Sequence, residues 1–193
     1  MLSANEPARL AHLEPYLINE VGKHFRETGQ LAVEDFWLIL IWKANRAKNN
    51  ERRRFEKVGD CTFEKAVKQI ASNLYVAQSS EKRLGVLMRD WKMKLPTASA
   101  VLTVLYPDSF TVYDIRVCDQ LQDFHKLAAR RFSTALWEDY QRFVAAVTEA
   151  TPTHLTLRQK DHHLWGLSLM EDVRTDLRAP APARNPPKLK SAA

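Results

Sequence analysis

The sequence predicts an all-α fold, a compact domain of several helices. The chain has only five glycines in 193 residues, few alternating runs of β-branched residues, and apolar residues repeated at spacings of three and four. Such spacing places apolar side chains on one face of a helix, whereas a half-buried strand would alternate with a period of two. We therefore expect one helical domain over residues 1–178, followed by a tail over 179–193.

Composition and charge narrow the classes of protein that the chain can be. It is 45% hydrophobic and 27% charged, which suits a single buried core, and its formal charge of +6 favours polyanions such as nucleic acid. Two cysteines, Cys61 and Cys118, are too few for a disulfide framework or a four-thiolate metal site. No run of eighteen apolar residues and no secretory leader is visible. We expect a cytoplasmic protein that does not associate with a membrane.

Apolar periodicity divides the first half of the chain into four helical segments. Residues 33–47 are apolar almost all the way round, so this segment is our candidate for the centre of the core. Gly29 is a suitable stop for the helix before it. The four segments are 7–28, 33–47, a helix capped by Asp60 or Thr62 with apolar residues from Phe63 to Leu74, and a helix from Ser80 to Trp91.

The stretch from Lys43 to Lys57 is strongly basic. Only Glu51 and Glu56 offset its cations, and the pattern leaves open whether it is a phosphate-facing loop or a solvated surface. The cations between its two ends are Arg46, Lys48, Arg52, Arg53 and Arg54.

The second half begins with a helix over 97–106 that Pro107 ends. Its small residues allow a partner helix to approach closely. A short extended run, 110–113, leads to Asp114, which is placed to cap a helix that passes through Val117 towards Phe124. Two amphipathic helices follow over 133–149 and 156–172, and the proline- and alanine-rich tail over 179–193 is predicted to be disordered.

The strings PTASAVL and VYDIRV, which carry Thr97 and Asp114, resemble motifs of the helix-hairpin-helix superfamily of base-excision DNA glycosylases. In that family a glycine-rich hairpin precedes a segment like KTANVVL, and an aspartate follows in a string like VDTHV. The likeness covers residues 31–121 as architecture, with the hairpin at about 81–106, and residues 95–117 as a motif. It implies duplex DNA as the partner.

The resemblance implies that Asp114 is the catalytic carboxylate. In the family this group stabilises positive charge on the sugar as the glycosidic bond breaks, or orients the attacking water, and a carboxylate suits both roles. Members that also cut the backbone use a lysine just before the segment matched by TASA, where this chain has Pro96. Proline cannot form a Schiff base, so we expect a monofunctional enzyme with little or no lyase activity.

The hairpin departs from the family pattern. The string WKMKL has no glycine, although glycine lets backbone amides approach a phosphate and permits positive φ. Ammonium groups of Lys92 and Lys94 are the expected replacement. No four-cysteine iron–sulfur motif is present, so the resemblance implies no cofactor, no metal and no tightly bound small molecule. The residues expected to contact DNA are Lys92, Lys94, Thr97, Arg52, Arg53 and Arg54.

Aromatic residues are candidates for a pocket that holds a flipped base. Trp42, Tyr106 and Trp137 are our candidates for its wall, although core packing explains them equally well. For Trp37 and Trp165 we expect packing alone. Asp161 falls on an apolar helix face, where we expect it to pair with a basic side chain or cap a helix. The adjacent His162 and His163 point apart on a helix, so we expect no metal site there.

Three functions remain open from the sequence. A glycosylase requires an open pocket beside Asp114, whereas a non-catalytic nucleic-acid-binding module would have that pocket filled. A protein-interaction domain would scatter its basic residues over the surface.

Overall fold

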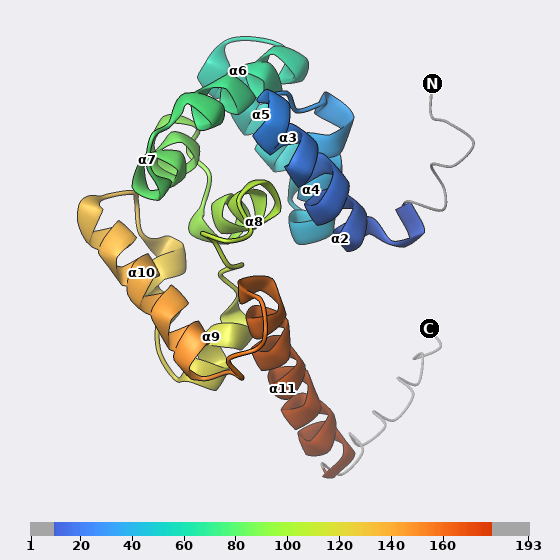
Figure 1. Cartoon of the computed structure of the whole chain (residues 1–193), viewed down its shortest axis with the longest axis vertical. Coiled ribbons are helices and arrows are strands. Elements are labelled where there is room, and N and C mark those ends of the chain that lie inside the picture. The colour runs from blue at the N-terminus through green and yellow to red at the C-terminus, as the bar shows by residue number, and fades with distance from the viewer. Residues whose placement is uncertain (1–9, 179–193) are drawn as a thin grey trace, which may run out of the picture.

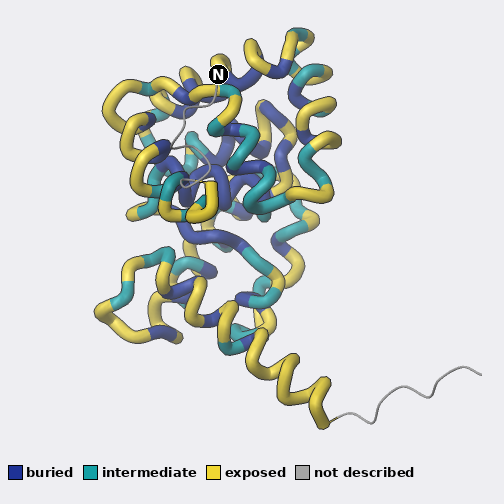
Figure 2. Tube along the Cα trace, turned by 90° about the vertical axis from the view of Figure 1, so that its right-hand side faces the viewer, coloured by how far each residue is buried: buried dark blue, intermediate teal, exposed yellow. Residues whose placement is uncertain are grey.

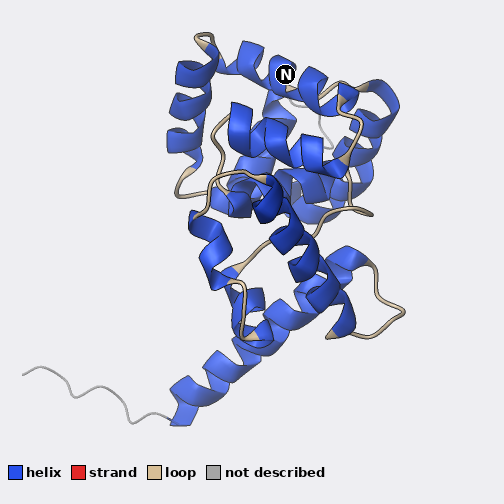
Figure 3. Cartoon of the chain, turned by 90° about the vertical axis from the view of Figure 1, so that its left-hand side faces the viewer, coloured by secondary structure: helices blue, strands red, loops and turns tan. Residues whose placement is uncertain are grey.

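The computed structural model describes residues 10–178, and over that range the protein is built from helices and loops (Figures 1 and 3). No strand occurs in the described part of the chain. The prediction of an all-α fold is therefore confirmed. The predicted tail, 179–193, lies outside the described residues.

The helices of the N-terminal half curve around the centre of the molecule, from the right of Figure 1 over its top to the left. Thr62 caps α6 by accepting a hydrogen bond from the Lys65 amide at 3.4 Å, and Gly29, at φ 72°, ends α3 as predicted. The elements are α2 (Leu13–Tyr16), the π-helical turn η1 (Leu17–Val21), α3 (Gly22–Thr28), α4 (Val33–Ala44), α5 (Lys48–Gly59), α6 (Phe63–Val76), α7 (Ser80–Gly85) and the π-helical turn η2 (Val86–Asp90).

Helix α8 (Leu95–Leu105) lies at the centre of the molecule (Figures 1 and 2). Every residue in it except Pro96, which occupies the first turn, is buried. Its neighbour α3 approaches so closely that a Cβ added to Gly22 would lie 2.1 Å from the Val104 carbonyl oxygen. Helix α4 also contributes Phe36, Ile39 and Leu40 to the core. The most buried helix is thus the small-residue helix, rather than the tryptophan-rich helix that the sequence favoured.

The C-terminal half begins where an extended segment leaves α8 and leads to α9 (Ile115–Leu121). Helix α11 (Leu157–Arg178) packs against α9 and against α10 (Thr134–Glu149), and its last turns project from the body (Figures 1 and 2). The 3-10 turn η3 (His125–Ala129) lies between α9 and α10 in the chain.

Several predicted boundaries differ from those observed. The basic stretch is mostly helical, because the fully buried Phe55 anchors α5 to the core while its cations face outward. Helix α9 ends at Leu121, since Gln122 adopts a left-handed conformation (φ 55°). Helix α11 continues six residues beyond the predicted end at Asp172.

Between residues 10 and 178, no helix is long and apolar enough to cross a membrane.

Candidate active site

Asp114 lies at the point where the extended segment becomes α9. Its backbone is extended (φ −132°, ψ 143°), and its Oδ1 accepts a hydrogen bond from the Arg116 amide at 3.1 Å, so it caps α9 as predicted. Its other oxygen, Oδ2, accepts a hydrogen bond from the Nζ atom of Lys43, at 2.6 Å. Lys43 belongs to the last turn of α4, 71 residues earlier in the chain.

Opposing effects set the protonation of Asp114. Burial alone would raise the pKa of its carboxyl group, but the Lys43 ammonium and the Arg116 amide outweigh burial and lower that pKa. The side chain is therefore a carboxylate at neutral pH. It can stabilise developing positive charge or accept a proton, but it cannot donate one.

Asp114 and Lys43 face a cavity of about 300 Å³ between α4, the extended segment and α11. This volume is at the lower end of the range for small-molecule sites. Two indole rings, those of Trp42 and Trp165, line it, and Trp165 is 41% exposed. The remaining lining residues are Val112, Val117, Arg158, Asp161 and His162.

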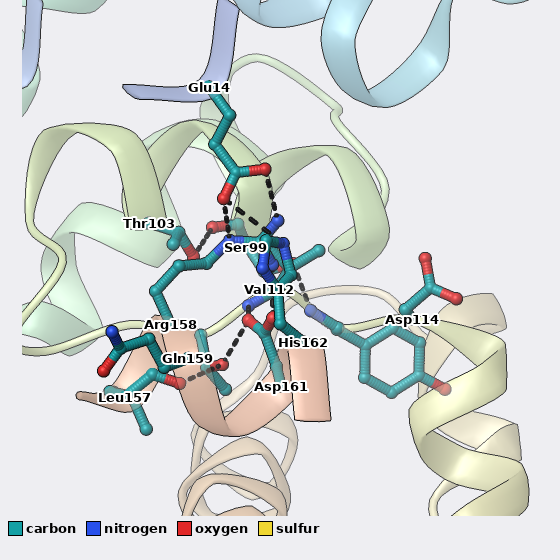
Figure 4. A network of polar contacts seen from close by, with 12 residues as sticks. Glu14, Ser99, Thr103, Val112, Asp114, Leu157, Arg158, Gln159, Asp161 and His162 are labelled. Atoms are coloured by element: carbon teal, nitrogen blue, oxygen red, sulfur yellow. Dashed lines mark hydrogen bonds and ion pairs between the residues drawn. The ribbon is translucent and has the colours of Figure 1, made fainter. Parts of the chain in front are cut away.

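A polar network fixes one wall of the cavity (Figure 4). The Arg158 guanidinium donates two hydrogen bonds to Glu14, both at 2.9 Å, and its carbon lies 5.0 Å from the centre of the Trp42 ring. The Trp42 indole N–H also donates to Glu14, at 3.2 Å. Burial alone would raise the pKa of Glu14, but hydrogen bonds from His162 and Arg158 lower it to about 2. These contacts hold the Trp42 ring in one orientation.

Asp161 joins the same network to the extended segment. Its Oδ2 accepts hydrogen bonds from the Thr111 hydroxyl at 2.6 Å and the Val112 amide at 3.0 Å, and its Oδ1 accepts one from Arg158. It is 2% exposed, and burial raises the pKa of its carboxyl group against the opposing effect of Arg158. The prediction that Asp161 pairs with a basic side chain is confirmed. Its contacts fix the backbone two residues before Asp114.

The glycine-free hairpin turn still contains a left-handed residue. Lys92 has φ 58°, the conformation for which glycine is usually chosen. The turn is closed by hydrogen bonds from the Trp91 amide to the Val86 carbonyl (3.0 Å) and from the Met93 amide to the Leu87 carbonyl (2.9 Å). Helix α7, η2, this turn and α8 follow one another over residues 80–105.

A second hollow, of about 570 Å³, lies between this turn and the loop after η3, and it is basic. Arg89 and Arg130 each pair with an acid, whereas Arg131 has no ion-pair partner in the described part of the chain. Apolar residues also line the hollow, among them Phe132, whose ring centre lies 5.7 Å from the guanidinium carbon of Arg89. The cations that line it are Arg89, Lys92, Lys94, Arg130 and Arg131.

The basic helix α5 lies close to this turn. Arg54 pairs with the buried Glu51 at 2.7 Å, and the Lys94 ammonium acts on the same carboxylate through space. Burial nevertheless raises the pKa of Glu51. Arg52 pairs with Glu56 along the helix at 3.0 Å, and Arg53 is exposed. Lys94 of the hairpin and helix α5 therefore meet around Glu51.

The structure brings some of the predicted site residues together and separates others. Trp42 lines the Asp114 cavity, but Tyr106 and Trp137 do not. Tyr106 packs against Phe25 and donates its hydroxyl hydrogen to the Leu74 carbonyl at 3.0 Å.

Two further predictions about individual side chains differ from the structure. Trp137, offered as a wall of the base pocket, packs against Phe110 and Tyr140 instead. Thr97 is buried in α8, so it does not present its side chain to DNA.

Sequence reasoning missed three residues of the cavity. Lys43 was read as part of a basic run, and Arg158 was not singled out. Trp165 was assigned to packing, which is wrong, because its ring lines the cavity and is partly exposed. The available signal was its spacing from Asp161, one helical turn away, which places both side chains on the same face of α11. Trp37 does pack in the core, against Phe63, as predicted.

Within the described residues, no group of three or more histidine, cysteine, aspartate or glutamate side chains is arranged to hold a metal ion. Comparison of the chain with protein-family models, curated proteins and solved structures found no match.

Proposed function

We propose that the protein binds duplex DNA and removes a base by hydrolysing its N-glycosidic bond, with Asp114 as the catalytic carboxylate. The observation that carries this proposal is the position of an ionised aspartate at a cavity lined by two indole rings. An enzyme that acts on a base must take the base out of the duplex and hold it against aromatic or apolar side chains.

The chemistry assigned to Asp114 follows from its charge. As the glycosidic bond lengthens, positive charge develops on the sugar, and a carboxylate fixed by a helix-cap hydrogen bond can stabilise that charge without reorganising. The same carboxylate can orient a water molecule and accept its proton. Trp42, held by Glu14 and Arg158, supplies a rigid surface for stacking.

Binding to the DNA backbone is assigned to the basic hollow at the hairpin turn. Lys92 and Lys94 lie at its edge beside Arg131, and phosphate contacts by such side chains give affinity without sequence preference. Arg52 and Arg53 of α5 extend the basic surface, whereas Arg54 is engaged by Glu51.

A second candidate is a nucleic-acid-binding module without catalysis. The Lys43–Asp114 ion pair favours it, because the ammonium occupies one oxygen of the carboxylate. The open cavity beside Asp114 favours the enzyme, since a binding module has no need of that space.

The experiment combines excision and binding on the full-length chain. Duplexes that carry one alkylated, oxidised, deaminated or mismatched base would be incubated with the protein, and the released base measured by mass spectrometry. Release from at least one duplex is expected, and its absence from the whole set would refute the enzymatic proposal. Binding of undamaged duplex at two salt concentrations separates the remaining functions, because phosphate contacts weaken steeply as salt rises.

A further inference from the structure

The basic hollow beside the hairpin turn is larger than phosphate contacts require. Its volume of about 570 Å³ exceeds the 300 Å³ of the Asp114 cavity and lies well within the range of small-molecule sites. Contacts to a nucleic-acid backbone are made by side chains at the protein surface, and they need no such space. The hollow can therefore take up a whole group of a ligand as well as contact its charge.

The charged residues that line the hollow are all cations. No aspartate or glutamate lines it in the part of the chain that the structure describes. Three of the five cations, Lys92, Lys94 and Arg131, form no ion pair with a carboxylate among the described residues. Lys92 donates its Nζ hydrogen to the Arg89 carbonyl at 2.7 Å, which leaves its charge without a counter-ion. A ligand that suits this hollow is therefore anionic.

The ring of Phe132 gives the hollow an aromatic side. The ring is partly exposed, and its centre lies 5.7 Å from the guanidinium carbon of Arg89. It also rests on α7, because a Cβ added to Gly85 would lie 3.1 Å from its Cζ atom. A planar heteroaromatic group can stack on an aromatic ring or on a guanidinium plane. The other apolar residues of the lining are Met88, Met93, Ala128 and Ala129.

We propose that the basic hollow binds one unpaired nucleotide, with its base on Phe132 and its phosphate on Lys92 and Arg131. A nucleotide combines the anion and the planar ring that this lining suits. Bases inside a duplex are stacked on their neighbours and offer no free ring face, so the nucleotide belongs to a single strand or is a free mononucleotide. The inference goes beyond the backbone contact assigned to this hollow, and it does not depend on the chemistry at Asp114.

The basic surface continues beyond the hollow, which favours a nucleic-acid strand over a peptide. Lys94 and helix α5 meet around Glu51, and Arg52 and Arg53 of that helix are exposed. A strand carries one phosphate for each nucleotide, so its charge can follow a surface of this length. A phosphorylated peptide offers a single phosphate and matches only the hollow.

The test compares two single strands of equal length and charge on the full-length chain. One is a short oligothymidylate, and the other has an abasic tetrahydrofuran in place of every nucleoside, so it keeps the phosphates and lacks the bases. Fluorescence anisotropy at one salt concentration gives both dissociation constants. Oligothymidylate is expected to bind about 5- to 100-fold more tightly, which is the effect of stacking one base on an aromatic ring. Equal affinity for the two strands overturns the inference.

Variants locate the effect in the hollow. Phe132→Leu keeps an apolar contact with α7 but removes the ring, so the ratio of the two dissociation constants should fall towards one. Tyr75→Leu removes an exposed ring of α6 outside the hollow and should keep the parental ratio. Arg131→Gln should weaken the binding of both strands by the same factor, because it removes a phosphate contact and leaves the ring. An unchanged ratio in a folded Phe132→Leu variant contradicts the inference.

Crosslinking gives the location without any variant. A strand that contains 5-iodouracil would be irradiated in complex with the protein, and the crosslinked peptide identified by mass spectrometry. We expect the crosslink within residues 88–94 or 128–132, which line the hollow. A crosslink confined to other parts of the chain overturns the inference.

Competition distinguishes the sources of the nucleotide. Displacement of the strand by thymidine monophosphate identifies a site for free nucleotides, whereas a strand that resists displacement is itself the ligand. Tighter binding of a phosphotyrosine peptide than of oligothymidylate would overturn the nucleotide in favour of a protein partner. Salt-dependent binding of duplex, together with equal affinity for the two single strands, would overturn the base site and leave the proposed backbone contacts standing.

Discussion

Asp161→Ala is expected to destabilise the fold more than removal of any exposed acid. Asp161 accepts hydrogen bonds from the Thr111 hydroxyl, the Val112 amide and Arg158, and it is almost fully buried. Breaking a buried ion pair by removing one partner costs about 3–5 kcal/mol. Arg158 keeps its two hydrogen bonds to Glu14, which reduces that cost, whereas the orphaned Val112 amide costs about 1–3 kcal/mol. We therefore expect a total at the lower end of the range, about 3 kcal/mol.

Urea unfolding followed by circular dichroism measures this loss. At an unchanged slope, the expected destabilisation lowers the midpoint by about 1–2 M urea. Asp172→Ala is the matched control on the same helix, because Asp172 pairs with Arg116 at 2.5 Å but is exposed, and exposed pairs contribute about 0–1 kcal/mol. A loss of less than about 1 kcal/mol for Asp161→Ala would refute the assigned role of this carboxylate in fixing the segment before Asp114.

Two further predictions concern Glu14 and Lys92. Because the folded protein lowers the pKa of Glu14 to about 2, its stabilisation is present above the unfolded value near 4.5 and is lost as pH falls towards 2. Glu14→Gln should therefore lower the free energy of unfolding by about 2–3 kcal/mol at neutral pH, and the variant should lose less stability than the parent between pH 4.5 and 2. Unfolding at a series of pH values measures both effects. The control Glu149→Gln should leave the dependence of stability on pH unchanged. Lys92→Gly replaces a lysine in the left-handed conformation, so thermal unfolding should show equal or higher stability. If the Lys92 ammonium contacts a phosphate, the slope of the logarithm of the duplex-binding constant against the logarithm of salt concentration should fall by about one. Loss of stability in Lys92→Gly, or an unchanged salt slope, would contradict the respective assignment.

Local features of the site were predictable from the sequence. The cap at Asp114 depends on a hydrogen bond from an amide two residues later, and the cap at Thr62 depends on an amide three residues later. Such contacts are encoded within one helical turn. The all-α class of the fold was predictable for the same reason, because apolar residues spaced three and four apart are also a local pattern.

The cavity itself was not predictable, because its walls come from distant parts of the chain. Lys43 and Asp114 are 71 residues apart, and Glu14 and Arg158 are 144 apart. Trp137 and Trp165 both lie on helices with apolar faces, and only tertiary packing decides that the first contacts Phe110 while the second borders the cavity. Helix α5 was missed because a single apolar residue, Phe55, anchors it.

The most direct test of the central claim is the rate of base release by Asp114→Asn, measured with excess protein on a duplex that the parent excises. Asparagine caps a helix as well as aspartate does, so the fold should be kept while the negative charge is lost. We predict a rate about 10²–10³-fold lower than that of the parent, and an unchanged rate for Asp108→Asn, an exposed control before the extended segment. A folded Asp114→Asn variant that releases the base at the parental rate would contradict the claim that this carboxylate is catalytic.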